Sequence, residues 1–163
     1  MEYIHLIHEI EPYFNKDSEI LILGSFPSVK SREAAFYYAH PQNRFWRLLA
    51  ELFSSAVPEN KEQKVNMLAA NKVALWDVIQ SCDISGSSDA SIKNAVVNDI
   101  PYILTNSSIG KIITNGQTAY RLYNKYLLDA ASIPAVSAPS TSPANASYSF
   151  ERLVAEWKKA IRD

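Results

Sequence analysis

The chain has 163 residues, of which 47% are hydrophobic and 20% charged, proportions that suit one soluble globular domain with a substantial core. Its single cysteine, Cys82, excludes an internal disulfide and a cysteine-based zinc or iron–sulfur site. A net charge of −1 and a pI of about 6.3 weigh against tight, non-specific binding to nucleic acid. No apolar run reaches about 18 residues and the N-terminus lacks a signal-peptide pattern, so we expect a cytoplasmic protein without a membrane span.

The first half of the chain predicts a strand set among helices. Residues 1–18 carry an apolar stripe that ends in turn-forming residues, which indicates a short helix and a turn. Residues 19–23 are apolar without alternation, as is typical of a buried strand. Ser28 or Ser31 could cap the helix that follows. Helices are expected, from their apolar spacing, over 32–36, 41–57 and 59–70.

The second half repeats this alternation. Residues 73–79 are predicted as a second buried strand, followed by a polar loop over 81–91. Further strands are expected at 111–114 and 133–137, and Pro134 indicates that the last of them lies at a sheet edge or begins at the proline. A helix is expected to begin within 98–101, and others are expected over 119–127 and 153–161.

Four short apolar strands that alternate with helices predict an α/β domain with a mostly parallel central sheet. Ligands of such folds bind at the carboxyl ends of the strands. The polar loops that follow the four strands are therefore expected to converge on one rim. They are residues 24–28, 77–82, 115–116 and 139–145.

Three of the polar stretches allow two interpretations each. The loop at 24–28 could bind phosphate or form a tight strand-to-helix turn, and it lacks both the P-loop spacing and the dinucleotide-binding glycine pattern. The tyrosines and polar residues of 37–43 could be ordinary loop residues or a surface that stacks on a flipped base. The Ser- and Pro-rich residues 139–143 could be a plain connection or grip a phosphate backbone.

Taken together, these stretches resemble the uracil-DNA glycosylase superfamily, and within it the hypoxanthine-DNA (deoxyinosine) glycosylase branch. The similar stretches are LILGSFPS at 21–28, YYAHPQNRFW at 37–46, ALWDV at 74–78, NG at 115–116 and PSTSPAN at 139–145. The resemblance covers nearly the whole chain. It implies one domain over 1–163, a three-layer α/β/α sandwich with a central four-stranded parallel sheet, and base excision without a cofactor or metal. It also implies a monomer that acts on DNA containing a deaminated base.

The resemblance further implies roles for individual residues. Tyr38, two residues before a His-Pro pair, is similar to the residue that stacks under the flipped base. Mismatch-specific uracil glycosylases carry an Asn where this chain has Phe26, so Asn43 becomes the best candidate to assist hydrolysis. The alternative for Asn43 is a residue at a helix start that bonds its own backbone.

The remaining candidate residues fall into two groups. Those expected to contact the base, besides Tyr38, are Phe26, His40, Asp77 and Asn115. Those expected to shape the pocket or contact the DNA backbone are Gly24, Ser25, Pro27, Ser28, Ser140, Thr141 and Ser142. The alternative for Asp77 is a strand-end residue with a local turn bond. Lys30 is interpreted as solvated or phosphate-facing rather than as the nucleophile of a lyase.

The chemistry of base excision is compatible with a modest catalytic group. Breaking the N-glycosidic bond builds positive character on the sugar and negative charge on the leaving base, which a positioned amide can stabilise. We therefore expect a monofunctional glycosylase that removes hypoxanthine. The alternatives are removal of uracil from G·U mismatches or single strands, and a non-catalytic nucleotide- or phosphate-binding module.

Overall fold

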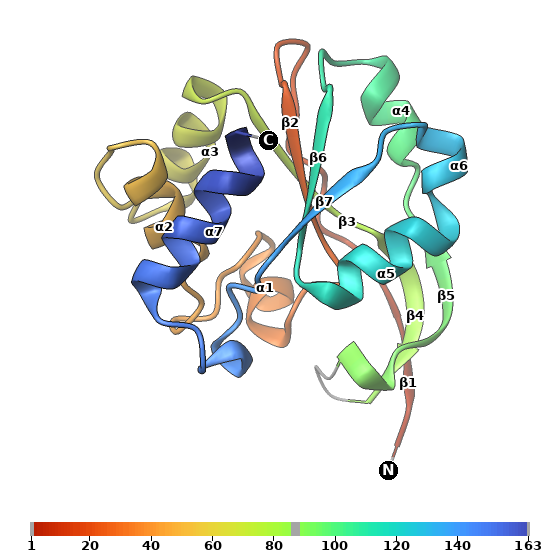
Figure 1. Ribbon diagram of the computed structural model, residues 1–163. Coiled ribbons are helices and arrows are strands. Elements are labelled where there is room, and N and C mark those ends of the chain that lie inside the picture. The colour runs from red at the N-terminus through yellow and green to blue at the C-terminus, as the bar shows by residue number, and fades with distance from the viewer. Residues whose placement is uncertain (1, 86–88, 163) are drawn as a thin grey trace.

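The structure is a computed structural model, and it describes residues 2–85 and 89–162. A parallel sheet of four strands lies at its centre, in the order β3-β2-β6-β7 (Figure 1). The strands are β2 (Ile20–Gly24), β3 (Val73–Asp77), β6 (Lys111–Asn115) and β7 (Ala135–Ala138). All four were expected from the sequence, and β7 lies at an edge, as Pro134 indicated.

Helices cover both faces of this sheet (Figure 1), which confirms the predicted three-layer sandwich. One face is covered by α2 (Phe45–Leu52), α3 (Lys61–Ala70) and α7 (Phe150–Arg162). The other is covered by α4 (Ile100–Thr105), α5 (Gln117–Tyr126) and α6 (Leu128–Ala131). None of the helices within the described ranges is long and apolar enough to cross a membrane.

Two hydrophobic cores lie on the two sides of the sheet, and β2 contributes to both. Successive side chains of a strand point to opposite faces. Ile22 accordingly packs in one core with Phe45 and Trp157, whereas Leu21 and Leu23 pack in the other. The unbroken apolar run of β2 is explained by this burial on both faces.

A second, antiparallel sheet was not predicted. It joins β1 (Ile4–Ile7), β4 (Ile79–Ile84) and β5 (Lys93–Val97) in the order β1-β4-β5. The helix expected within 1–18 is therefore wrong, because pairing with β4 supplies the backbone partners of this short segment. The loop expected over 81–91 is wrong as far as Ile84. Residues 86–88 of that loop lie outside the described part of the chain.

Short helices and turns connect the sheets to the rim. Ser28, one of the two expected caps, is the N-cap of α1 (Val29–Ala34) and accepts a hydrogen bond from the Ser31 N–H. The helix expected from residue 41 begins only at Phe45, because the preceding segment forms a turn. Two 3₁₀ turns complete the fold, η1 (Asp89–Ser91) and η2 (Pro143–Asn145).

Candidate active site

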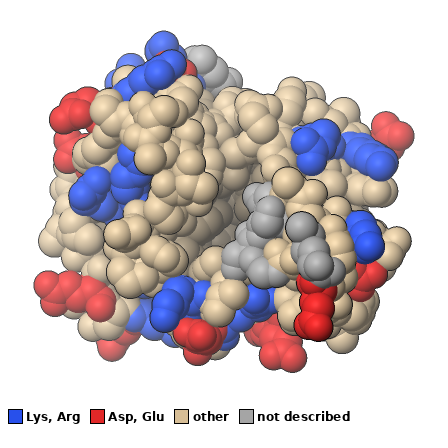
Figure 2. All heavy atoms as spheres, turned by 90° about the horizontal axis from the view of Figure 1, so that it is seen from below, with Lys and Arg blue, Asp and Glu red and all other residues tan. Residues whose placement is uncertain are grey.

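A cavity of about 600 Å³ opens at the carboxyl ends of the four parallel strands. Every predicted site residue except His40 lines it. The loops at 24–28, 115–116 and 139–145 converge there as predicted, whereas only Asp77 of the predicted loop 77–82 does, because β4 begins at Ile79. Figure 2 shows this face of the molecule, with a recess near its centre and Lys and Arg side chains toward its margins. Asp77 is the only charged side chain that lines the cavity within the described chain.

Gly24 ends β2 and allows two polar groups to approach closely. A Cβ atom at this position would lie 2.4 Å from Asp77 Oδ1 and 3.2 Å from the Tyr38 hydroxyl oxygen. The first distance is far below van der Waals contact. The glycine is therefore required by packing, which brings a carboxylate, a phenol and the end of a strand together at the cavity wall.

The loop after Gly24 is a strand-to-helix turn. The backbone N–H of Val78 donates to the Gly24 carbonyl at 2.8 Å, and the Ser28 hydroxyl caps α1. Ser25 and Phe26 are both nearly buried. The loop is therefore a tight strand-to-helix turn that also lines the cavity.

Asp77 is held by a residue that the sequence analysis missed. His8 Nε2 lies 2.8 Å from Asp77 Oδ2, and the two side chains are only 1% and 4% exposed. The His8 ring packs edge-on against Phe26, with centroids 5.9 Å apart, and lies 6.3 Å from the Tyr37 ring. No local sequence pattern indicates this pair, because 69 positions separate its members.

Tyr38 stacks on a fully buried ring. Its centroid lies 4.0 Å from that of Phe45, with 27° between the planes. Its backbone is left-handed, with φ of 55°, which is uncommon for a tyrosine. Tyr38 also lines the cavity. One face of the ring is thus covered by Phe45.

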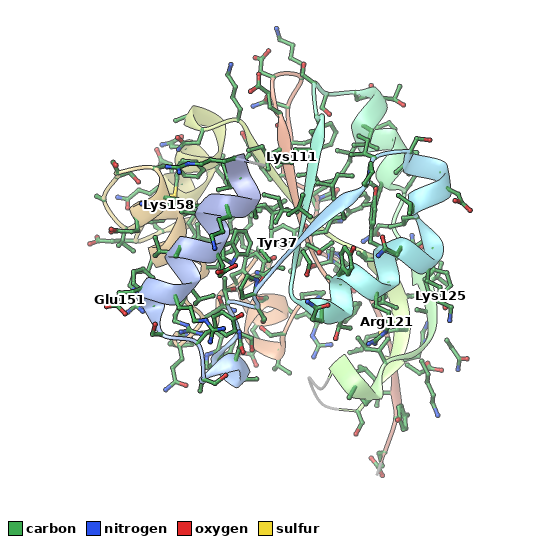
Figure 3. All side chains as sticks on the ribbon, in the orientation of Figure 1. Tyr37, Lys111, Arg121, Lys125, Glu151 and Lys158 are labelled. Carbon is green, nitrogen blue, oxygen red and sulfur yellow. The ribbon has the colours of Figure 1, made fainter. Side chains whose placement is uncertain are left out.

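The hydroxyl groups of two adjacent tyrosines stay protonated. Burial raises the pKa of Tyr38 well above its usual value, Asp77 adds to the rise, and the nearby Asn115 amide opposes it only in part. The buried Tyr38 hydroxyl makes no hydrogen bond of good geometry with any described residue. Burial and Asp77 also raise the pKa of Tyr37, which lies near the centre of Figure 3 and donates to the Glu11 carbonyl at 3.0 Å.

Asn43 has two ends with different surroundings. Its Oδ1 accepts a hydrogen bond from the Phe45 N–H at 2.9 Å, which is the local backbone bond named as its alternative. This bond also orients the amide, because only the oxygen can accept. The Nδ2 group makes no hydrogen bond with any described residue, and Asn43 lines the cavity.

The Ser- and Pro-rich loop is fastened to β6. Asn115 Nδ2 donates to Thr141 Oγ1, and the Thr141 N–H donates back to Asn115 Oδ1, each at 3.0 Å. Both ends of the Asn115 amide are therefore engaged in holding the loop. Thr141 is fully buried and lines the cavity, which fits a part in shaping the pocket and not contact with a DNA backbone.

Ser140 and Ser142 are the hydroxyls of this loop that remain at its surface. Both are partly exposed and line the cavity. Ser140 Oγ accepts from the Ser142 N–H, and Ser142 Oγ accepts from the Ala144 N–H, each at 3.1 Å. The Arg44 guanidinium donates to the carbonyls of Asn145 and Tyr148 and so holds the end of the loop.

Two other candidates lie away from the cavity. His40 Nδ1 accepts from the Gln42 N–H at 3.1 Å, and His40 is absent from the lining, so the predicted contact with a base is not supported. Lys30 is exposed, with its ammonium 3.7 Å from a Glu33 carboxylate oxygen. Within residues 2–85 and 89–162, no three His, Cys, Asp or Glu side chains are grouped so that they could hold a metal ion.

Comparison with known proteins agrees with this geometry. The family model described as "Uracil DNA glycosylase superfamily" matches residues 11–163. The chain belongs to this superfamily. It is 32% identical, over 91% of its length and 93% of the relative's, to a hypoxanthine DNA glycosylase of Methanosarcina acetivorans. It is 38% identical over 88 residues to a hypoxanthine DNA glycosylase of Methanosarcina barkeri, a match that covers 53% of this chain and 56% of that relative.

A solved structure of the superfamily supports the fold directly. The solution NMR structure of a proposed uracil DNA glycosylase from Methanosarcina acetivorans matches with a TM-score of 0.82 at 30% identity, over 98% of each chain. The resemblance that the sequence motifs indicated is therefore confirmed at the level of the uracil DNA glycosylase superfamily.

Proposed function

We propose that this chain is a monofunctional DNA glycosylase that hydrolyses the N-glycosidic bond of deoxyinosine and so releases hypoxanthine. The observation that carries the proposal is the Tyr38 ring, backed by Phe45 at the wall of a cavity of about 600 Å³. An enzyme that acts on a base must take it out of the helix and hold it in a pocket of this kind. The relatives named hypoxanthine DNA glycosylase favour this base.

Tyr38 and Asp77 would hold the base from two directions. The stack on Phe45 keeps the tyrosine ring rigid, so that its free face can bind a planar base. Asp77 Oδ1 is an acceptor at the cavity wall. Hypoxanthine carries a donor, N1–H, beside its O6 acceptor, and the backbone at Phe26 is the candidate donor to O6.

Asn43 would assist the departure of the base. Because its oxygen is engaged by Phe45, its NH₂ group is the end available for the reaction. Negative charge develops on the base as the glycosidic bond breaks, and an amide donor placed toward it stabilises that charge. A single positioned donor of this kind contributes about 10²- to 10³-fold to the rate of an enzyme.

Ser140 and Ser142 are the remaining candidates for contact with the DNA backbone. Their loop is already ordered by its own hydrogen bonds, so little conformational entropy is lost when DNA binds. We further propose that the chain acts as a monomer and as a single domain. Light scattering of the free protein, alone and with a short duplex, measures the first of these directly.

End-labelled duplexes that contain one deoxyinosine or one deoxyuridine test the proposed activity. Alkali-labile breaks at inosine, and few or none at uracil in a G·U pair or a single strand, are the expected result. Breaks mainly at uracil would replace hypoxanthine by uracil as the substrate. No abasic product from any of these strands would overturn the proposed enzyme.

A further inference from the structure

We propose that His8 is a positioning residue for base specificity, and that it acts by holding the Asp77 carboxylate as a fixed hydrogen-bond acceptor. The inference rests on the proposed excision of hypoxanthine. It goes beyond that function because it explains how the site would tell hypoxanthine from adenine, the normal base from which hypoxanthine arises by deamination.

The two oxygens of Asp77 have different surroundings. Oδ2 is paired with His8 Nε2 at 2.8 Å. Oδ1 lies against Gly24 at the cavity wall and makes no hydrogen bond with any described residue. One oxygen is therefore anchored and the other is left for a ligand.

His8 is itself held from several sides. Its backbone N–H donates to the Gln80 carbonyl at 2.6 Å. Its ring lies near those of Phe26 and Tyr37, and its side chain is 1% exposed. A ring in this position cannot swing away from Asp77 without opening the packing around it.

The proposal places a hydrogen on Nε2 of His8. With Asp77 as a carboxylate, which can only accept, Nε2 donates this hydrogen to Oδ2. A buried charge also persists only when it is paired with a donor of this kind. His8 thereby keeps Asp77 an acceptor and prevents the carboxyl group from turning.

A fixed acceptor discriminates between the two purines. Hypoxanthine presents N1–H, which can donate to Asp77 Oδ1, whereas adenine presents an N1 lone pair, which would face the carboxylate oxygen without a proton between them. A site whose buried polar group finds its partner in only one of two bases rejects the other strongly. Without His8, the carboxyl group could turn away from N1–H, and this discrimination would weaken.

The test compares His8→Leu with His8→Gln. Leucine removes the donor, whereas the glutamine NH₂ group reaches about as far as Nε2 and can restore it. Binding is measured on duplexes that carry the non-cleavable 2′-fluoroarabino forms of deoxyinosine and deoxyadenosine. His8→Leu should reduce the ratio of the two affinities by about 10- to 100-fold, and His8→Gln should recover most of it.

His5 supplies a matched control in the same sheet. His5 Nδ1 lies 2.9 Å from Asp83 Oδ1, but its side chain is 60% exposed, and the pair lies outside the cavity. His5→Leu should leave the affinity ratio unchanged. An unchanged ratio in folded His8→Leu would overturn the proposal, because a residue that merely ties two strands together affects stability and not the choice of base.

A second measurement needs neither catalysis nor a tolerant variant. Long-range ¹H–¹⁵N NMR spectra of the free protein report which ring nitrogen of His8 carries a hydrogen. A protonated Nε2 supports the proposal, and a bare Nε2 overturns it. If the wild-type chain releases neither base, the proposed function fails, whereas the ratio of affinities and the protonation of Nε2 still decide the role of His8.

Discussion

The Phe45 N–H donates a hydrogen bond to Asn43 Oδ1 at 2.9 Å. Phe45 is also the ring on which Tyr38 stacks. The first residue of α2 therefore orients the candidate catalytic amide with its backbone and supports the candidate stacking residue with its side chain. A shift at the start of this helix would displace both groups together.

Asn43→Asp separates the two ends of the amide. Aspartate keeps the acceptor for the Phe45 N–H and removes the NH₂ donor, so stability should change little. Single-turnover excision of hypoxanthine should fall about 10²- to 10³-fold, the usual effect of losing one positioned donor. Excision near the wild-type rate would exclude donation by Asn43. Asn43→Ala removes both ends and should also destabilise the fold by about 1 kcal/mol.

Gly24→Ala tests the close approach of Asp77. The new methyl group would lie 2.4 Å from Asp77 Oδ1, so the carboxylate must move. We expect a loss of about 1–3 kcal/mol in the free energy of unfolding, together with loss of excision. Gly110→Ala is the control, because a Cβ there has no neighbour within 4 Å. Normal excision by Gly24→Ala would show that the Asp77 carboxylate can move without loss of activity.

Tyr38→Phe and Tyr38→Leu separate stacking from hydrogen bonding. Phenylalanine keeps the stack on Phe45 and removes a buried hydroxyl that has no well-placed partner. Its melting temperature should be unchanged or higher, by the equivalent of about 1 kcal/mol. Leucine removes the aromatic face and should reduce excision much further than phenylalanine. Equal losses in the two variants would contradict a stacking role.

Alkaline pH should destabilise the fold through Tyr123. Burial raises its pKa from 10.0 to about 12, and its hydroxyl donates to the Ile133 carbonyl. The folded state thus holds the proton more tightly than the unfolded state, so this contribution is present below pH 10.0 and is lost as the pH rises toward 12. Urea titrations across this range should show a smaller decline for Tyr123→Phe. An identical decline in the two proteins would show that Tyr123 does not contribute to the loss of stability at alkaline pH.

Lys111→Met tests stability far from the cavity. Lys111 lies at the opposite end of the sheet from the rim (Figure 3), and its ammonium donates to the carbonyls of Ala160 and Ile161 at 3.0 and 2.8 Å. These carbonyls are near the C-terminus of α7, where a cation is favourable. The variant should lose about 1 kcal/mol of stability and keep its rate of excision. A lower rate of excision per folded molecule would contradict the prediction that Lys111 contributes to stability alone.

Local sequence patterns were sufficient to predict the central sheet, its flanking helices and the rim on which the site lies. β2, β3 and β6 are short, largely apolar runs because they are buried on both faces, and that pattern is local. The carboxyl ends of parallel strands share one edge, so the order of the elements was enough to bring Gly24, Asp77 and Asn115 to one rim. From Ser81 to Ile84, polar and apolar residues alternate and the apolar ones are buried, which is a strand signal within the segment predicted as a loop.

Which side chains meet at the site depends on contacts between elements that are distant in the chain. His8 follows β1, which pairs with β4, and so comes to lie beside Asp77, a residue far from it in the chain with which it shares no sequence pattern. The two hydrogen bonds between Asn115 and Thr141 likewise join residues that no local sequence pattern pairs. Periodicity records which face of an element is buried, but the partner of a buried polar group depends on contacts between elements, and a single sequence does not specify those contacts locally.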